Sequence, residues 1–518
     1  MLFNTFVFLL FFVVVYAIFL GFGWFAGKQK WAYRAQNLWL LLASYFFYGW
    51  WEWFFLTLIL ISTIIDYCAA ILIEGSENQI RRRLYLSVSI IANLGLLFTM
   101  KYYDFFAVNL IDSWNQLALW LGSTEATNSN TYLLRNIILP VGISFYTFQT
   151  MSYTIDVFRR QIKAERDFFD FALFVNYFPQ LVAGPIERAQ DLLPQLKKPK
   201  FPTLDGVQKG LYDILLGYFM KVYVADNLAT YVDQVFLAGK SLYTQNPEII
   251  QTLDGSQIFA GAVLFLPQIY CDFAGYSFIA LGISRLLGVT LTVNFETPEF
   301  SKTPTEFWNR WHVTLNRWFR DYIYISLGGS KYGKFAQYRN LFIIFFLSGL
   351  WHGANWTFIA WGCLQGVYTI VYLVGFAKKK EEKTEPVSTE SPTLTDKLFS
   401  ILSGTSSRVL IYMLVAFSGI AFRSYDAQMM FLYMKKFLSF WNWDLHPNNN
   451  IKDMVGILGE YFRIFIPLLI LDGITYFKKE RYWIFQIHPL FQAFLLSFMG
   501  FLILTRGIFG KEVIYFAF

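Results

Sequence analysis

Long apolar runs alternate along the chain with short polar interruptions. The first run extends from Phe3 to Phe25, and no Lys or Arg precedes Lys28. Comparable runs recur about eleven to thirteen times, each close to the roughly 20 residues with which a helix crosses a bilayer. This pattern predicts an all-α polytopic membrane protein. The first run is too long and too uniformly apolar for a cleaved signal peptide, so we expect it to be a retained span.

Some polar interruptions fall inside the apolar runs. Pro140 and Gly142, in LPVGISFYTFQ, predict a kinked or irregular helix. Residues 176–189, NYFPQLVAGPIERA, contain two prolines and a glycine and are not expected to form an unbroken span. Two interpretations remain open for them: a re-entrant or surface segment enclosed by protein, or a plain loop between spans.

The region from Ala377 to Lys397 has a different composition. It is charged, rich in Pro, Ser and Thr, and free of apolar periodicity, which is typical of a mobile loop. We expect it to be cytoplasmic. It need not separate two domains, so the prediction is one integral-membrane domain over residues 1–518.

Composition and charge agree with a membrane location. The 518 residues are 56% hydrophobic and only 15% charged, against about 25% charged in soluble domains. The net charge of +7 comes from short basic clusters between the runs, which is typical of cytoplasmic loops facing anionic lipid. This arrangement places both termini outside, makes membrane lipid a partner, and disfavours nucleic-acid binding.

Cysteine usage does not indicate a metal site or a disulfide framework. Cys68, Cys271 and Cys363 are widely spaced in apolar surroundings and lack C-x-x-C spacing. Asp272 is the more informative polar residue, because it interrupts an apolar helix beside small residues in CDFAGYSF. It is either a buried structural carboxylate or a site residue that binds substrate.

The segment from Phe307 to Trp361 carries the most chemistry. It contains two of the four histidines, His312 in FWNRWH and His352 in GLWHGANWTF. Imidazole titrates near neutral pH, and an ionisable group inside a membrane bundle is a functional-site hypothesis by default. His352 follows an apolar run and lies between glycines, so we expect it to be buried, as either a structural or a catalytic residue.

Helical spacing around His312 predicts two faces. Trp311, Trp318 and Tyr322 are expected to pack inward, while Arg310, Arg317 and Arg320 gather on the other face. Such a segment is either an amphipathic cytoplasmic helix anchored by arginines or a site that binds the phosphates of a substrate.

Six motifs occur in order: LPVGISFYTFQ, FPQLVAGPIER, DFAGYS, TEFWNRWH, WFRDYIYISLGG and SGLWHGANWTFIAWG. Together they resemble the membrane-bound O-acyltransferase family, and within it the bacterial branch that modifies polysaccharides. The resemblance implies a multi-helix fold of about eleven to thirteen spans, with re-entrant and interfacial helices around a central funnel.

The resemblance also implies roles for particular residues. His352 would be the catalytic base within the membrane, and His312 a second active-site histidine closer to the cytoplasm. Asn355 and Trp351 would shape the substrate site. Transfer would use an acyl thioester, either acetyl-CoA or a carrier-linked acyl group, with no bound cofactor or metal. The acceptor would be an envelope polysaccharide, reached with the help of a periplasmic or extracellular acyltransferase partner, in a bacterial inner membrane.

Two positions depart from the pattern of the family, and the C-terminal end follows it. Relatives often carry an acidic residue where this chain has Phe278, and a histidine where it has Gln365, so the acceptor is open. The C-terminal VIYFAF resembles an aromatic ending of this branch, in which Tyr515 is either an acyl acceptor or relay, or an interfacial aromatic anchor.

Other functions fit parts of the pattern. Acyl or D-alanyl transfer to teichoic acid, peptidoglycan or lipid would use the same motifs. A transporter or flippase would also have many spans and broken helices, but we find no inverted repeat. A scaffold for an envelope complex would leave the two histidines without a role.

Overall fold

The computed structural model describes residues 1–26, 30–122, 139–237, 252–376, 394–440 and 451–514. These residues form helices joined by irregular segments, with no strand among them. The predicted loop at 377–397 lies largely outside the described residues, which resume at Leu394. The all-α class predicted from the sequence is confirmed.

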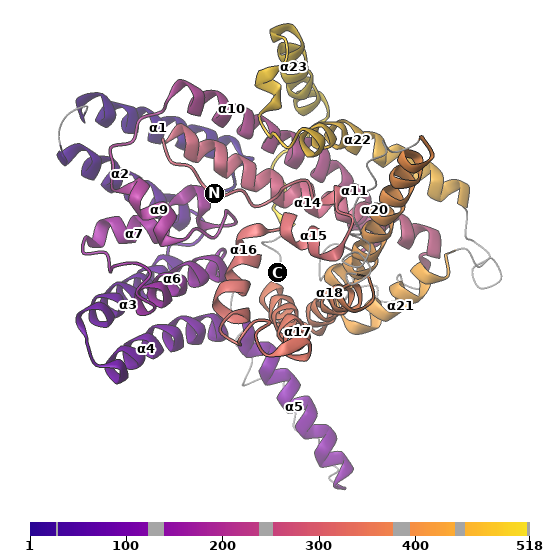
Figure 1. Ribbon diagram of the computed structural model, residues 1–518, viewed down its shortest axis with the longest axis horizontal. Helices are drawn as coiled ribbons and strands as arrows, with labels where there is room; N and C mark the ends of the chain where they lie inside the picture. The colour runs from indigo at the N-terminus through magenta and orange to yellow at the C-terminus, as the bar shows by residue number, and fades with distance from the viewer. Residues whose placement is uncertain (27–29, 123–138, 238–251, 377–393, 441–450, 515–518) are drawn as a thin grey trace.

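The N-terminal helices are long and apolar. Their bounds are α1 (Phe6–Ala26), α2 (Lys30–Gly49), α3 (Phe55–Gly75), α4 (Gln79–Leu97), the π-helical turn η1 (Phe98–Tyr102) and α5 (Tyr103–Trp120). The last three make one continuous rod of 42 residues, and α5 projects away from the body (Figure 1). The polar composition of Ser113 to Thr131 predicts a loop; this is wrong up to Trp120, where α5 ends, and the part from residue 123 lies outside the described residues.

The next helices are short and lie in the interior. They are α6 (Ile143–Phe158), α7 (Phe168–Asn176), α8 (Phe178–Leu181) and α9 (Ala189–Leu196). Gly142, at φ 81°, starts α6 in a left-handed conformation that suits glycine. Residues 170–187 are buried throughout although their backbone is broken. This is the condition under which irregular backbone is tolerated at membrane depth.

Helix α14 (Gly255–Leu286) is the centre of the bundle, and nearly all of its residues are buried. It packs against α10 (Leu204–Tyr218), the π-helical turn η2 (Phe219–Ala225) and α11 (Asp226–Val235). A Cβ placed on Gly282 would lie 2.4 Å from the Gly210 carbonyl oxygen. The α10–α14 crossing therefore requires glycine.

The motif-rich segment folds into short helices followed by two long ones. The bounds are η3 (Pro298–Phe300), α15 (Pro304–Arg310), α16 (Val313–Phe319), η4 (Arg320–Tyr324), α17 (Gly333–His352) and α18 (Trp356–Gly375). The helical spacing predicted across this segment is interrupted, because Trp311 is extended and His312 is left-handed.

The C-terminal helices complete the bundle. They are α20 (Leu394–Arg423), α21 (Ala427–Leu438), α22 (Ile451–Lys478), η5 (Trp483–Gln486) and α23 (Pro489–Arg506). Helices α20, α21 and α22 all contact α14, so the core is completed by residues distant in sequence.

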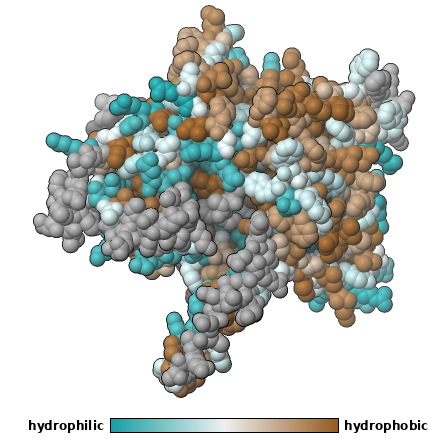
Figure 2. Space-filling view, turned by 180° about the vertical axis from the view of Figure 1, so that it is seen from behind, coloured by the Kyte–Doolittle hydropathy of each residue, from teal (hydrophilic) through white to brown (hydrophobic). Residues whose placement is uncertain are grey.

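Eight described helices are long and apolar enough to cross a membrane. The sequence predicted about eleven to thirteen spans on the roughly 20-residue criterion. The difference arises partly because α17 is less apolar than a typical span. The apolar pattern also predicts a span from Leu211 to Val235, but this helical stretch carries Asp213, Lys221 and Asp226. Hydrophobic residues cover much of the face seen from behind (Figure 2), as expected for a protein surrounded by lipid.

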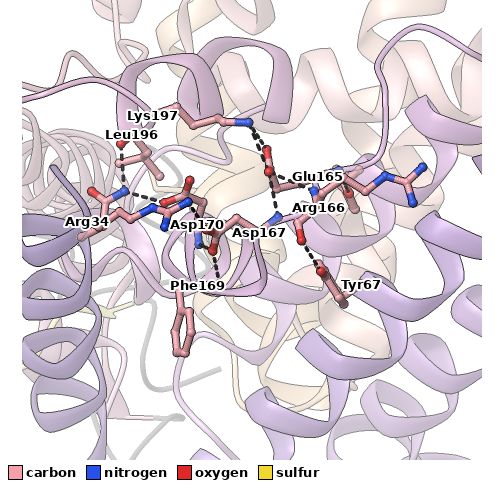
Figure 3. A network of polar contacts seen from close by, with 11 residues as sticks. Arg34, Tyr67, Glu165, Arg166, Asp167, Phe169, Asp170, Leu196 and Lys197 are labelled. Carbon is pink, nitrogen blue, oxygen red and sulfur yellow. Dashed lines mark hydrogen bonds and ion pairs between the residues drawn. The ribbon is translucent and has the colours of Figure 1, made fainter. Parts of the chain in front are cut away.

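A polar network fixes α7 and α9 against α2 and α3 (Figure 3). Lys197 forms an ion pair with Glu165 at 2.9 Å, and Glu165 also accepts the backbone N–H groups of Arg166 and Asp167. The Tyr67 hydroxyl donates to the Arg166 carbonyl at 2.6 Å. These bonds hold the region between α6 and α7 in place, near the predicted cytoplasmic clusters.

Candidate active site

His352 is the last residue of α17, and close packing against α18 determines its position. A Cβ on Gly349 would lie 2.4 Å from the Phe358 carbonyl oxygen, and one on Gly362 would lie 2.3 Å from the Phe345 carbonyl oxygen. The two backbones therefore touch where α17 ends, so the position of His352 depends on a contact between helix backbones.

Aromatic rings surround the His352 imidazole. Its centroid lies 4.9 Å from those of Trp351 and Trp361 and 5.2 Å from that of Phe422, each in an edge-to-face arrangement. The residue is 5% exposed, so the predicted burial is confirmed. Rings packed in this way restrict the imidazole to a few orientations.

His312 occupies the break between α15 and α16. Its φ of 41° is in the left-handed region, which non-glycine residues seldom adopt. The ring is buried against Phe273, 4.8 Å between centroids, and lies 6.1 Å from Trp351. Burial lowers the pKa of the His312 imidazole to about 3, so the ring is neutral at physiological pH. The Trp351 ring is thus close to both histidine rings.

Lys101, from the π-helical turn η1, reaches the end of α17. Its Nζ donates to the carbonyl of Trp351 at 2.7 Å and to that of His352 at 3.1 Å. Lys101 and His352 also line one cavity of about 40 Å³, together with Gly142 and Ser144 at the start of α6. The remaining lining residues are mostly apolar.

A second small cavity, of about 30 Å³, lies next to rings that contact the histidine. Trp361 and Phe422, which contact the His352 ring, belong to its lining. Gln365 also lines it and donates to the Ser418 hydroxyl at 2.6 Å. Gln365 therefore places a neutral amide close to the site.

The largest of these cavities, of about 580 Å³, adjoins the His312 side. It is lined by Phe295, which contacts the His312 ring, and by Arg310, Lys479 and Arg481. Phe278 lies in the same lining, with the Arg481 guanidinium 4.1 Å from its ring centroid. Phe278 therefore takes part in a cation–π contact in this lining.

The three predicted arginines do not gather at one place. Arg310 pairs with Glu306 at 3.2 Å and lines the large cavity, whereas Arg317 and Arg320 line a separate cavity of about 390 Å³. The expectation of one arginine face was wrong, because the left-handed His312 turns the chain between α15 and α16. The inward packing of Trp311, Trp318 and Tyr322 is confirmed by their burial.

Asp272 takes part in a buried ion-pair cluster. Its carboxylate lies 2.5 Å from Lys221 Nζ, which also pairs with Asp226 at 2.8 Å. The second oxygen of Asp272 accepts the backbone N–H of Ile514 at 2.7 Å. These contacts favour the structural interpretation, in which Asp272 anchors the C-terminal segment. Tyr515 lies outside the described residues.

Asn355 begins α18 as its N-cap. Its side chain accepts the Thr357 N–H at 3.1 Å and donates to the Tyr425 carbonyl at 2.8 Å. Both ends of the amide are therefore engaged in holding α18, and the lining of the His352 cavity does not include Asn355. Trp351, by contrast, lines that cavity.

Sequence reasoning gave no role to Lys101, although the chain did carry a signal for it. A lysine inside an apolar run is a functional-site hypothesis in its own right. Its partners are 250 and 251 residues away along the chain, so only the folded structure identifies them.

Comparison with known proteins gives consistent results. The sequence profile of the membrane-bound O-acyltransferase family, MBOAT, matches residues 2–377. A Pseudomonas syringae pv. tomato protein described as a probable alginate O-acetylase, AlgI, is 35% identical over 93% of this chain and 83% of its own length. A Helicobacter pylori peptidoglycan O-acetyltransferase is 34% identical over 65% of this chain and 64% of its own length. A Streptococcus thermophilus teichoic acid D-alanyltransferase is 30% identical over 51% and 63%, respectively.

Proposed function

Because the chain belongs to the membrane-bound O-acyltransferase family and is an acyltransferase, we propose that it moves an acetyl group to an exported or cell-surface polysaccharide. The donor would be a cytoplasmic thioester and the acceptor a sugar hydroxyl. The polysaccharide named for the AlgI relative supports this acceptor class. We place the enzyme in a bacterial inner membrane, where donor and acceptor lie on opposite sides.

The observation that carries the proposal is the environment of His352. Its imidazole is buried among aromatic rings and lines a cavity into which a cation also projects. As a general base, His352 would take the proton of the acceptor hydroxyl while that oxygen attacks the thioester carbonyl. Such catalysis contributes about 10²- to 10⁴-fold in rate. Direct transfer of this kind needs no serine or cysteine nucleophile.

The donor would approach through the cavity of about 580 Å³. Its lining carries three cations, Arg310, Lys479 and Arg481, and two carboxylates, Glu296 and Asp472. The excess of cations suits the phosphates of a nucleotide or phosphopantetheine thioester. Phe295, in the same lining, contacts His312, and the Trp351 ring is close to both that ring and His352. His312 would therefore act on the donor side of the site.

The test is acyl transfer by a His352→Ala variant of the purified, reconstituted protein. We expect transfer of radiolabelled acetyl groups to fall to background while thermal unfolding stays close to the wild type. His488→Ala is the matched control, because that histidine caps exposed α23 away from the site. Retained transfer by the His352 variant would remove this residue from the chemistry.

A second acceptor class is supported by the other relatives, whose names specify peptidoglycan and teichoic acid. Mass spectrometry of isolated envelope polymers, with and without the protein, distinguishes the possibilities. Loss of acetyl groups from polysaccharide alone supports the first proposal, whereas loss from peptidoglycan or of D-alanine from teichoic acid supports the alternative.

A further inference from the structure

Lys101 caps the carboxyl end of α17. The last carbonyls of a helix have no partner within the helix, and a cation near them is favourable. Lys101 Nζ donates hydrogen bonds to the carbonyls of Trp351 and His352, and the Tyr102 hydroxyl donates to the carbonyl of Leu350 at 3.1 Å. Both donors come from η1, and π-helical turns of this kind occur frequently at functional sites.

Capping alone does not account for the position of this cation. Lys101 lines the cavity beside His352, and the described residues in that lining include no carboxylate. A buried charge without a counter-ion is costly. The amino end of α6 lines the same cavity, carries the positive end of a helix dipole and has no side-chain cap. Both features raise the electrostatic potential at the same place.

We propose that Lys101 binds the oxyanion that forms when the acceptor attacks the thioester, an inference that rests on the proposed function. An ammonium has three N–H donors, and within the described chain two of them are engaged by Trp351 and His352. The third is the donor for the developing oxyanion. Lys101 is thus a catalytic residue alongside His352.

The reaction balances with these groups. His352 takes the hydroxyl proton as the acceptor oxygen bonds to the carbonyl carbon, and the carbonyl π pair moves to the oxygen beside Lys101. The oxyanion then collapses, the carbon–sulfur bond breaks, and the thiolate receives the proton from the imidazolium. The products are an ester and a free thiol, and both side chains return to their initial state.

The size of the cavity limits the acyl group that can react there. A single water molecule needs about 10–15 Å³ of cavity volume. The cavity of about 40 Å³ therefore has room for about three small groups. That is the size of an acetyl unit. A long fatty acyl chain does not fit beside Lys101 and His352.

The test compares acetyl and fluoroacetyl thioester donors in the full-length protein. Fluorine stabilises the oxyanion without help from the protein, so an oxyanion-binding residue matters less for fluoroacetyl transfer. We expect Lys101→Met to slow acetyl transfer by about 10²- to 10³-fold and fluoroacetyl transfer by at most about tenfold, with the KM for the donor unchanged. Lys101→Gln can still donate to the α17 carbonyls and provides a neutral variant that keeps the cap.

The matched control is Lys200→Met. Lys200 also donates to a helix-terminal carbonyl, that of Leu196 at 2.9 Å, but it is absent from the lining of the His352 cavity. We expect this variant to lose stability and to treat both donors alike. The proposal for Lys101 would be overturned if Lys101→Gln slowed acetyl and fluoroacetyl transfer equally, or slowed neither. Absence of transfer from either donor by the wild type would instead overturn the proposed function.

Discussion

The glycine contact between α17 and α18 gives a quantitative prediction for Gly362→Ala. The added Cβ would lie 2.3 Å from the Phe345 carbonyl oxygen and 3.0 Å from the Gly349 Cα. Because ordinary contacts of this kind need about 3.5 Å, the helices must separate by about 1 Å. His352 is at the end of α17, three residues beyond Gly349, so the separation displaces its imidazole.

A misplacement of about 1 Å can cost about 10²-fold in rate, and overpacking typically costs about 1–3 kcal/mol in stability. We therefore expect Gly362→Ala to remain folded but to lose about 10²-fold in acetyl-transfer rate. The assay is initial-rate transfer by purified variants, accompanied by thermal unfolding of each.

Two other glycines of α18 calibrate the effect. A Cβ on Gly366 meets its nearest neighbour at 3.3 Å, and one on Gly375 meets nothing within 4 Å. The rates should therefore decrease in the order Gly375→Ala, Gly366→Ala, Gly362→Ala. If Gly362→Ala keeps a rate within about twofold of Gly375→Ala, a separation of about 1 Å does not matter, and the reasoning about His352 fails.

Three further predictions concern other parts of the molecule. Asp272→Asn leaves Lys221 with one carboxylate partner, and we expect it to lower the unfolding free energy by about 3 kcal/mol, measured by thermal unfolding. Burial raises the pKa of Glu187 to about 7. The folded state therefore binds the Glu187 proton more tightly than the unfolded state does. The stabilisation from this difference is complete below about pH 4.5 and is lost as pH rises through about 7. Glu187→Gln should flatten that dependence in melting curves recorded across this range. Arg310→Gln should raise the KM for the donor several-fold and Arg317→Gln should not, since the two residues line different cavities; equal effects in steady-state kinetics would argue against the donor path.

The sequence by itself determined the class of the protein and predicted the burial of His352. Runs of about 20 apolar residues leave the chain few alternatives to membrane-spanning helices, because unpaired backbone groups are too costly in hydrocarbon. The apolar run and the glycines around His352 were sufficient to predict its burial. This prediction and that of the spans depend only on residues adjacent in the chain.

The tertiary structure decided which side chains meet. Helical spacing placed Arg310 with Arg317 and Arg320, but the left-handed backbone of His312 separates them into two cavities. Lys101 meets His352 across 251 residues, and Asp272 meets Lys221 and the C-terminal backbone. Periodicity reports only which residues share a face of one helix, whereas these contacts depend on how separate helices pack, and that is determined by the whole bundle.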